Sequence, residues 1–441
     1  MSTKKDKFSN KDKIYMKLAL NLARARHGHT GINPSVGCVI VKNDEIISIG
    51  QTNHNGRPHA EYNAINNSNE NLEGSKMYVT LEPCNHYGKT PPCTNLIIKK
   101  KIKEVVYSIN DIDKKVKGKS FKILKSKNII VKKNLLKNEI NNFYIPYFYN
   151  RKNNLPYVTG KIATSKNNLI YTKGKKRITD NHSDKLTHFL RFKNDSLMIS
   201  YKTLNQDNPK LDCRLKGLNK FSPKRVILDN NLETNINSHI FRTANKNNTI
   251  IFYNNADKKK ITLFKKKGIQ LIKSNLIKKR YFDLKLVLKK LYKAGIRNVL
   301  VEGGDDLSCS FLKKKLFNEF YLFKSPKNLS KSFAYKDFNC FKYLSQNYKN
   351  KKKINTLGKD SITLYKIGIR NILVEGGNDL SSSFLKDKLF NEFYLFKSPK
   401  KLSKLVAYKD FNCFKYLSLN YRNKKKINTL LGKDSINLYK V

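Results

Sequence analysis

The chain has 441 residues, of which 39% are hydrophobic and 11% aromatic, so it can bury two or three domain cores and is not a disordered polyelectrolyte. Its 90 lysines and arginines against 33 aspartates and glutamates give a formal net charge of +57, which favours the binding of anions. Because lysine is spread along the whole chain and Trp is absent, we interpret most of this charge as drift in an AT-biased genome, and a nucleic-acid-binding function as the weaker alternative.

The first predicted domain spans residues 1–148 and alternates helix-like with strand-like segments. Four apolar residues spaced three or four positions apart predict a helix over 11–27: Ile14, Leu18, Leu22 and Ala25. Two strand-like runs, 33–41 and 45–50, flank a turn-forming Asn-Asp pair and predict a hairpin. The remaining elements follow in the order helix, strand, helix, strand: 59–67, 76–82, 93–102 and 104–109.

A second predicted domain spans residues 155–366, after a polar and aromatic segment at 149–154 that we expect to be a linker. A helix-like run covers 182–192. Strand-like runs follow the opening strand at 155–165: 195–200, 224–229, 248–253 and 298–304. Strands that alternate with helices predict a second α/β domain.

The end of the chain contains an internal repeat. The segment that begins "LYKAGIRNVLVEGGDDLSCSFL" at Leu291 returns as "LYKIGIRNILVEGGNDLSSSFL" at Leu364, an offset of 73 residues. Solenoid repeats diverge and come in several copies, so this near-identical pair indicates a recent tandem duplication. We therefore interpret 367–441 as a duplicate of 291–366. One sheet has one place for the segment, and we expect the first copy to occupy it.

Targeting and cysteine usage point to a cytoplasmic protein. No run reaches the roughly 18 apolar residues that a membrane span needs, and the N-terminal residues show no signal peptide. The seven cysteines are scattered and odd in number, which argues against a disulfide framework. We expect a reducing compartment.

Three residues in the first domain have the side chains of a zinc site: His59, Cys84 and Cys93. A catalytic zinc keeps three protein ligands and one open position, where Glu61, two residues after a helical histidine, could exchange protons. The order H-x-E, then P-C, then a further Cys is typical of zinc nucleoside and nucleobase deaminases. The alternative is a structural zinc closed by a fourth ligand, for which His54, His86 and Cys38 are the candidates.

The spacing of the cysteines leads to a family. Eight residues separate Cys84 from Cys93, and "TLEPCNHYGKTPPCT", "NPSVGCVIV" and "GRPHAE" closely resemble the deaminase domain of the bifunctional riboflavin-biosynthesis enzymes. The resemblance extends over residues 11 to about 366. It implies a cytidine-deaminase-like α/β/α sandwich followed by a dihydrofolate-reductase-like α/β domain. It also implies zinc at His59, Cys84 and Cys93, proton transfer by Glu61, and contact of Asn33 with the pyrimidine.

The family deaminates 2,5-diamino-6-(5-phosphoribosylamino)pyrimidin-4-one and then reduces the ribosyl group to ribityl with NADPH. In the second domain the residues alone say little: Gly303 and Gly304 form a strand-to-helix turn that suits a phosphate, and no G-x-G-x-x-G is present. The resemblance implies NADPH contacts at six positions: Ala163, Thr203, Asp207, Asn230, Gly303 and Gly304. It implies contacts with the reductase substrate at five: Lys161, Arg191, Leu211, Arg214 and Glu302.

The second domain also departs from the family pattern. The family's S-L-D-G is "SKNN" at 165–168, and Asn230 stands where a serine is expected. One alternative is therefore a deaminase with an inactive reductase half, and another is a basic nucleic-acid-binding protein of deaminase fold. The main hypothesis is a bifunctional enzyme that uses Zn²⁺ and NADPH on phosphoribosylated pyrimidines, without a membrane or a specific nucleic acid, and that forms a homo-oligomer.

Overall fold

The structure is a computed structural model of the chain in two compact units, Met1–Gly368 and Ile369–Val441. It describes these residues: 8–88, 90–113, 116–171, 178–277, 280–330, 335–348, 350–354, 358–366, 392–397, 423–427 and 435–440. Among the described helices, none combines the length and the apolar character that crossing a bilayer requires.

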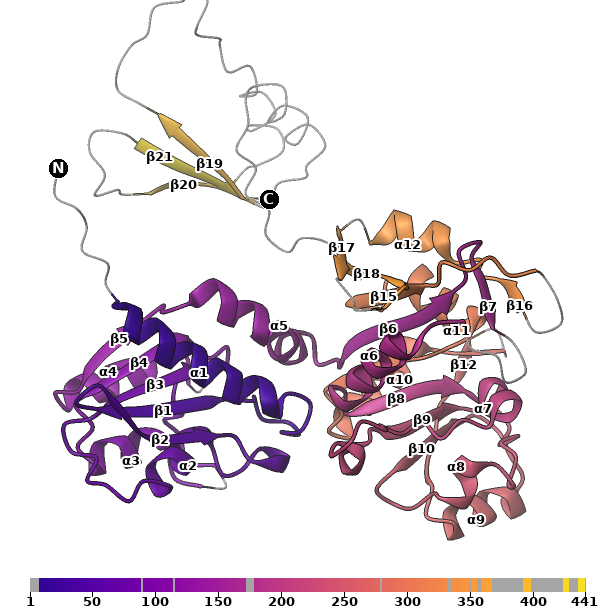
Figure 1. The fold of residues 1–441 in the computed structure, drawn as a ribbon, viewed down its shortest axis with the longest axis horizontal. Helices are drawn as coiled ribbons and strands as arrows, with labels where there is room; N and C mark the ends of the chain where they lie inside the picture. The colour runs from indigo at the N-terminus through magenta and orange to yellow at the C-terminus, as the bar shows by residue number, and fades with distance from the viewer. Residues whose placement is uncertain are drawn as a thin grey trace, which may run out of the picture. The chain divides into compact units, whose positions relative to one another are not determined.

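A five-stranded sheet forms the core of the first domain, in the order β2-β1-β3-β4-β5. Strands β3, β4 and β5 are parallel, and β1 is antiparallel to both β2 and β3. The strands are β1 Gly37–Lys42, β2 Glu45–Gln51, β3 Lys76–Leu81, β4 Glu104–Ile109 and β5 Ile130–Lys133. The helices are α1 Asn10–Arg26, α2 Ala60–Asn66, α3 Cys93–Lys99, α4 Lys119–Ser126 and α5 Lys137–Asn153, with a 3-10 turn at His54–Gly56. Figure 1 shows α1 and α5 on one face of the sheet and α2 and α3 on the other.

Two local features explain how the sandwich closes. Helix α1 begins at a capping box, in which Ser9 and Asp12 each bind the other's backbone N–H. On the opposite face, Gly50 of β2 lets α2 approach closely, since a Cβ there would lie 2.2 Å from the carbonyl oxygen of Ala60. Gly50 therefore sets how closely the helix that carries Glu61 packs against the sheet.

The expected linker at 149–154 is wrong, because most of it is the last turn of helix α5. The helix ends at Asn153, and Asn154 is left-handed with a φ of 53°. Buried Asn150 fixes this end, since its Nδ2 donates to the carbonyl oxygens of Leu155 and Arg297, each at 2.9 Å. The polar and aromatic composition suggested a linker, because composition alone does not reveal the hydrogen bonds to these two carbonyl oxygens.

A nine-stranded sheet forms the second domain, in the order β11-β10-β9-β8-β14-β6-β15-β18-β17. All neighbouring strands are parallel except the last two pairs, β15 with β18 and β18 with β17. Its strands are β6 Tyr157–Thr164, β8 Ser196–Ser200, β9 Lys224–Leu228, β10 Thr249–Tyr253, β11 Gln270–Lys273, β14 Asn298–Val301, β15 Glu319–Lys324, β17 Asn350–Ile354 and β18 Ser361–Lys366. Two small pairs lie outside it: β7 Leu169–Tyr171 with β16 Tyr335–Asp337, and β12 Leu276–Ile277 with β13 Tyr281–Phe282.

The helices of the second domain connect these parallel strands. They are α6 Asn181–Phe192, α7 Tyr201–Asp207, α8 His239–Arg242, α9 Lys258–Lys266, α10 Leu284–Lys293, α11 Asp305–Lys313 and α12 Phe341–Asn347, with a 3-10 turn at Asn219–Phe221. Helix α7 begins directly after β8, and α11 follows β14 after three residues. Because β8 and β14 are neighbouring parallel strands, both helix starts lie at the same edge of the sheet.

The two copies of the repeat have different surroundings. The first copy supplies four strands of the nine-stranded sheet: β14, β15, β17 and β18. In the second copy, β19 Glu392–Lys397, β20 Asn423–Ile427 and β21 Ser435–Lys440 form a separate sheet in the order β19-β21-β20. This order repeats β15-β18-β17, so the described strands of both copies pair in the same way. The twin of the Gly303-Gly304 turn, at 376–377, lies outside the described residues.

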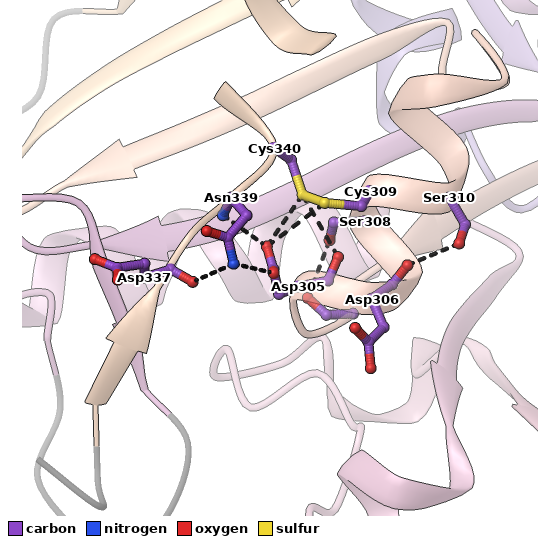
Figure 2. The surroundings of a disulfide bond; sticks show 9 residues. Asp305, Asp306, Ser308, Cys309, Ser310, Asp337, Asn339 and Cys340 are labelled. Atoms are coloured by element: carbon purple, nitrogen blue, oxygen red, sulfur yellow. Dashed lines mark hydrogen bonds between the residues drawn. A yellow bond between two sulfur atoms is a disulfide. The ribbon is translucent and has the colours of Figure 1, made fainter. Parts of the chain in front are cut away.

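One disulfide joins Cys309 to Cys340, which are 31 positions apart in the sequence (Figure 2). Four cysteines of the described part are free: Cys38, Cys84, Cys93 and Cys213. A single bridge is not a framework, but no pattern in the sequence predicted it. The two cysteines meet only because helices α11 and α12 pack against each other.

Candidate active sites

The predicted zinc ligands come together from three elements. His59 is the N-cap of α2, Cys84 follows β3, and Cys93 is the first residue of α3. Nδ1 of His59 lies 3.5 Å from Sγ of Cys84 and 3.5 Å from Sγ of Cys93. A tetrahedral zinc with ordinary bond lengths would separate a nitrogen and a sulfur ligand by about 3.6 Å. The three side chains therefore fit a zinc ion.

The cluster has three ligand atoms among the described residues, with no fourth His, Cys, Asp or Glu within its 4.8 Å span. His54 stacks on Phe221, with ring centroids 4.9 Å apart. Cys38 is fully buried within the sheet core, and neither it nor His86 belongs to the cluster. This favours the open, catalytic type of site over a zinc closed by a fourth ligand.

The two thiols of the cluster differ: the hydrogen bond with Cys84, and then burial, raise the pKa of Cys93, whereas the pKa of Cys84 is lowered. Hydrogen bonds from Cys93, including its backbone N–H at 3.2 Å, and from His59 lower the pKa of Cys84 to about 4, which favours the thiolate that binds zinc. Glu61 lies in the first turn of α2 and is 4% exposed. Burial raises the pKa of its carboxyl group to about 7. A group that can be protonated or ionised near neutral pH thus lies beside the cluster.

Asn33 lies in the same pocket as His59, Glu61 and Cys84. Its Nδ2 donates to the carbonyl oxygen of Gly56 at 2.9 Å, which fixes the amide, while no described residue donates to its Oδ1. That oxygen can accept a hydrogen bond from an amino group of a ligand.

Sequence reasoning assigned no role in this pocket to Arg57, Asp111, Asp113, Tyr147 and Arg151, and it considered His86, which also lines the pocket, only as a fourth zinc ligand. Nδ1 of His86 is buried and has no hydrogen-bond partner among the described residues. Arg151 was assigned to the expected linker, and only the correct end of α5 brings it to the pocket. The two arginines can bind an anionic ligand, and Asp111 and Asp113 line the same pocket with the opposite charge.

The second pocket is a cavity of about 420 Å³ at the ends of β6, β8 and β14, a volume typical of small-molecule sites. Seven of the residues expected to bind NADPH or substrate line it: Lys161, Ala163, Thr203, Asp207, Glu302, Gly303 and Gly304. A Cβ at Gly304 would meet no atom within 4 Å, so this turn leaves room for a ligand beside the backbone. The pocket also receives the start of α11, where helix N–H groups favour a phosphate.

Arg191 reaches this pocket through Glu302. Its Nε and Nη2 donate to the two carboxylate oxygens of Glu302 at 2.7 and 2.8 Å, and its Nη1 donates to the carbonyl oxygen of Asp212 at 3.0 Å. Burial alone would raise the pKa of Glu302, but the charge and hydrogen bonds of Arg191, together with the charge of Lys161, hold this pKa below its usual value. Burial lowers the pKa of Lys161 in the same pocket.

Besides Arg191, three expected site residues do not line the cavity: Leu211, Arg214 and Asn230. Leu211 is buried with a φ of 56°, and Nη1 of Arg214 pairs with Asp212 at 2.5 Å. Nδ2 of Asn230 donates to the carbonyl oxygen of Arg280 at 3.1 Å. Their assignment stays a prediction.

Comparisons with known proteins match both domains. A family described as the RibD C-terminal domain matches residues 156–331 and 362–404, and the cytidine and deoxycytidylate deaminase zinc-binding region matches residues 9–109. The riboflavin biosynthesis protein RibD of Aquifex aeolicus is 35% identical over 357 residues, which cover 80% of this chain and 98% of that protein.

Solved structures agree as well. Acinetobacter baumannii RibD, form 1, has 29% sequence identity and a TM-score of 0.70, and the match covers 81% of this chain and 99% of that one. A diaminohydroxyphosphoribosylaminopyrimidine deaminase/5-amino-6-(5-phosphoribosylamino)uracil reductase from Thermotoga maritima has 29% identity and a TM-score of 0.68, with the same coverage of each chain. The predicted fold class is confirmed: a deaminase-like domain followed by a dihydrofolate-reductase-like domain.

Proposed function

The chain belongs to the family of the bifunctional riboflavin biosynthesis protein RibD, and we propose that it divides that family's two reactions between the two pockets described above. It is a zinc-dependent deaminase and an NADPH-dependent reductase that acts on small phosphoribosylated pyrimidines. The observation that carries the residue assignment is the open cluster of His59, Cys84 and Cys93, with Glu61 beside it.

In the first pocket, His59, Cys84 and Cys93 would hold a zinc ion, which would lower the pKa of a bound water and supply a nucleophile near neutral pH. Glu61 takes a proton from the attacking water and returns it to the leaving amino group. Oδ1 of Asn33 accepts a hydrogen bond from the pyrimidine and orients the ring. The reaction releases ammonia and leaves a carbonyl group on the ring.

Arg57 and Arg151 face the phosphoribosyl part of the substrate. Both guanidinium groups border the pocket, and α5 holds Arg151 over it. A planar guanidinium binds phosphate oxygens in pairs, so these residues select a phosphorylated pyrimidine over a free base.

In the second pocket, NADPH supplies the hydride and the protein supplies orientation and charge. The turn at Gly303 and Gly304 would hold the nucleotide phosphates, and Ala163, Thr203 and Asp207 line the same cavity. Lys161 and the Glu302 carboxylate, which Arg191 orients, would contact the ribosyl group. Leu211, Arg214 and Asn230 lie outside the cavity lining, and no contact is assigned to them here.

We assign residues 1–148 to the deaminase, 155–366 to the reductase and 367–441 to a surplus duplicate. In the match with Aquifex aeolicus RibD, 80% of this chain covers 98% of that protein. The chain is therefore about one fifth longer than that relative, which supports a surplus segment. We further propose a cytoplasmic homo-oligomer with no specific nucleic-acid partner.

The test is a two-step assay on purified, zinc-loaded protein at moderate salt. The diaminopyrimidine substrate should release ammonia without NADPH, and NADPH should then be oxidised in step with the product. Ammonia release without NADPH oxidation would instead favour the deaminase with an inactive reductase half. Base-specific deamination of RNA would favour the nucleic-acid alternative, whereas salt-sensitive RNA binding without sequence preference would only reflect net charge.

A further inference from the structure

A covalent cross-link borders the reductase pocket. Cys309 lies on α11, one helical turn after Asp305, and Cys340 directly precedes α12. Their sulfurs form the disulfide in Figure 2, which ties the helix that starts the nucleotide turn to a segment 31 positions further along the chain. Neither cysteine is among the residues that we assign to NADPH or to the reductase substrate.

Asp305 connects this disulfide with the pocket. It is 7% exposed, is the first residue of α11 and lines the cavity beside Gly303 and Gly304. Its Oδ1 accepts the backbone N–H of Asn339 at 3.0 Å and its Oδ2 accepts Nδ2 of the same residue at 2.9 Å. Sγ of Cys340 lies 3.1 Å from Oδ1. One carboxylate thus contacts both the residue before the bridge and the bridge itself (Figure 2).

The two copies of the repeat differ in the residues of this cluster. At the equivalent positions, 73 residues later, the second copy keeps Cys413 for Cys340 but has Asn378 for Asp305 and Ser382 for Cys309. The second copy therefore cannot form the bridge, although its sequence keeps the Glu-Gly-Gly motif. The motif and the cysteine pair are thus separable in the sequence.

We propose that Cys309 and Cys340 form a thiol–disulfide switch that sets how tightly the reductase pocket binds its nucleotide. The proposal rests on the proposed placement of NADPH at Gly303 and Gly304. In the disulfide state, α11 and Asn339 are held together, so the turn is ordered before the nucleotide arrives. In the dithiol state only the hydrogen bonds of Asp305 hold them, and binding must order the turn.

The chemistry needs one low-molecular-weight disulfide, such as oxidised glutathione. The partly exposed Cys309 loses its proton and its thiolate attacks one sulfur of that disulfide, which becomes bonded to Cys309 in a mixed disulfide. The other sulfur of the small disulfide leaves as a thiolate and takes up the proton. The buried Cys340 then attacks the Cys309 sulfur of the mixed disulfide and releases the second small thiol. Two protein thiols are oxidised and one small disulfide is reduced to two thiols. In a reducing compartment such a bridge is typically transient and redox-sensing.

The test uses the full chain, zinc-loaded, equilibrated at a series of ratios of oxidised to reduced glutathione. Free thiols are trapped by alkylation, the Cys309–Cys340 peptide pair is quantified by mass spectrometry, and NADP⁺ affinity is measured by calorimetry. We expect the disulfide form to bind NADP⁺ about tenfold more tightly. Because coupling is reciprocal, saturating NADP⁺ should shift the half-oxidation ratio by the same factor.

Equal affinity in the two states, or a half-oxidation ratio that NADP⁺ does not change, would overturn the switch but not the assigned pocket. Absence of NADP⁺ binding in both states would instead overturn the pocket assignment. Cys309→Ser, which copies the residue at Ser382, should hold the weaker affinity at every glutathione ratio. Cys413→Ser should respond like the parent protein, and loss of the response in that variant would contradict the assignment to Cys309 and Cys340.

Discussion

Arg191 and Glu302 form a two-point ion pair, with Nε to Oε1 at 2.7 Å and Nη2 to Oε2 at 2.8 Å. Their side chains are only 12% and 14% exposed. The two residues lie 111 positions apart, on α6 and after β14, and each was expected to contact the reductase substrate. The structure joins them into one unit that presents the Glu302 carboxylate to the cavity.

Breaking this pair should destabilise the reductase domain. Arg191→Met leaves a buried carboxylate without its partner, which we expect to cost about 3 kcal/mol of unfolding free energy. Urea unfolding followed by circular dichroism measures the loss. The double variant Arg191→Met/Glu302→Gln removes both charges and should recover part of the stability but not NADPH oxidation. An Arg191→Met protein as stable as the parent would show that the pair contributes nothing.

The zinc content of two variants distinguishes a site with three protein ligands from a site with four. Cys84→Ser should lower zinc to well below one per chain and abolish ammonia release, while NADPH oxidation on the second-step substrate continues, because the reductase pocket lies in another domain. His86→Asn is the matched control: His86 borders the pocket but is outside the cluster, so one zinc per chain should remain. Loss of zinc in His86→Asn, measured by atomic absorption, would contradict the open site.

The close contact at Gly50 predicts a specific effect on the deaminase. Gly50→Ala would place a Cβ 2.2 Å from the carbonyl oxygen of Ala60 and push α2 away from the sheet. We expect a cost of about 2 kcal/mol in stability and a large fall in ammonia release, since His59 and Glu61 move with the helix. Gly74→Ala is the comparison, because its φ is +79° but nothing lies within 4 Å. It should lose similar stability and keep deamination. Equal activity in the two variants would refute this role of Gly50.

Deletions across the repeat test which copy the reductase needs. Removal of 367–441 should leave both activities and change the melting temperature by only a few degrees, because the first copy supplies the strands of the large sheet. Removal of 294–366 joins Lys293 to Ile367 and brings the second copy into the same register. That protein should fold and oxidise NADPH, but without a response to glutathione. Insolubility or loss of NADPH oxidation after removal of 367–441 would show that the duplicate is structural.

The deaminase site could be predicted from the sequence because its ligands lie in short local patterns. His59 and Glu61 lie two positions apart at one helix start, and Cys84 and Cys93 enclose one loop. The reductase pocket depended on resemblance, since Lys161, Asp207 and Glu302 come from distant segments. The Arg191–Glu302 pair, the Cys309–Cys340 bridge and the approach of Arg151 arise from tertiary packing between elements far apart in the chain. The spacing of residues within one segment does not predict such contacts.

The central claim is that Glu61 transfers protons beside a zinc held by His59, Cys84 and Cys93. The most direct measurement is ammonia release by Glu61→Gln and by the parent protein, with zinc content determined on the same samples. We predict one zinc per chain in both proteins and a fall in turnover of about 10²- to 10⁴-fold in the variant. Unchanged turnover in zinc-loaded Glu61→Gln would contradict the account.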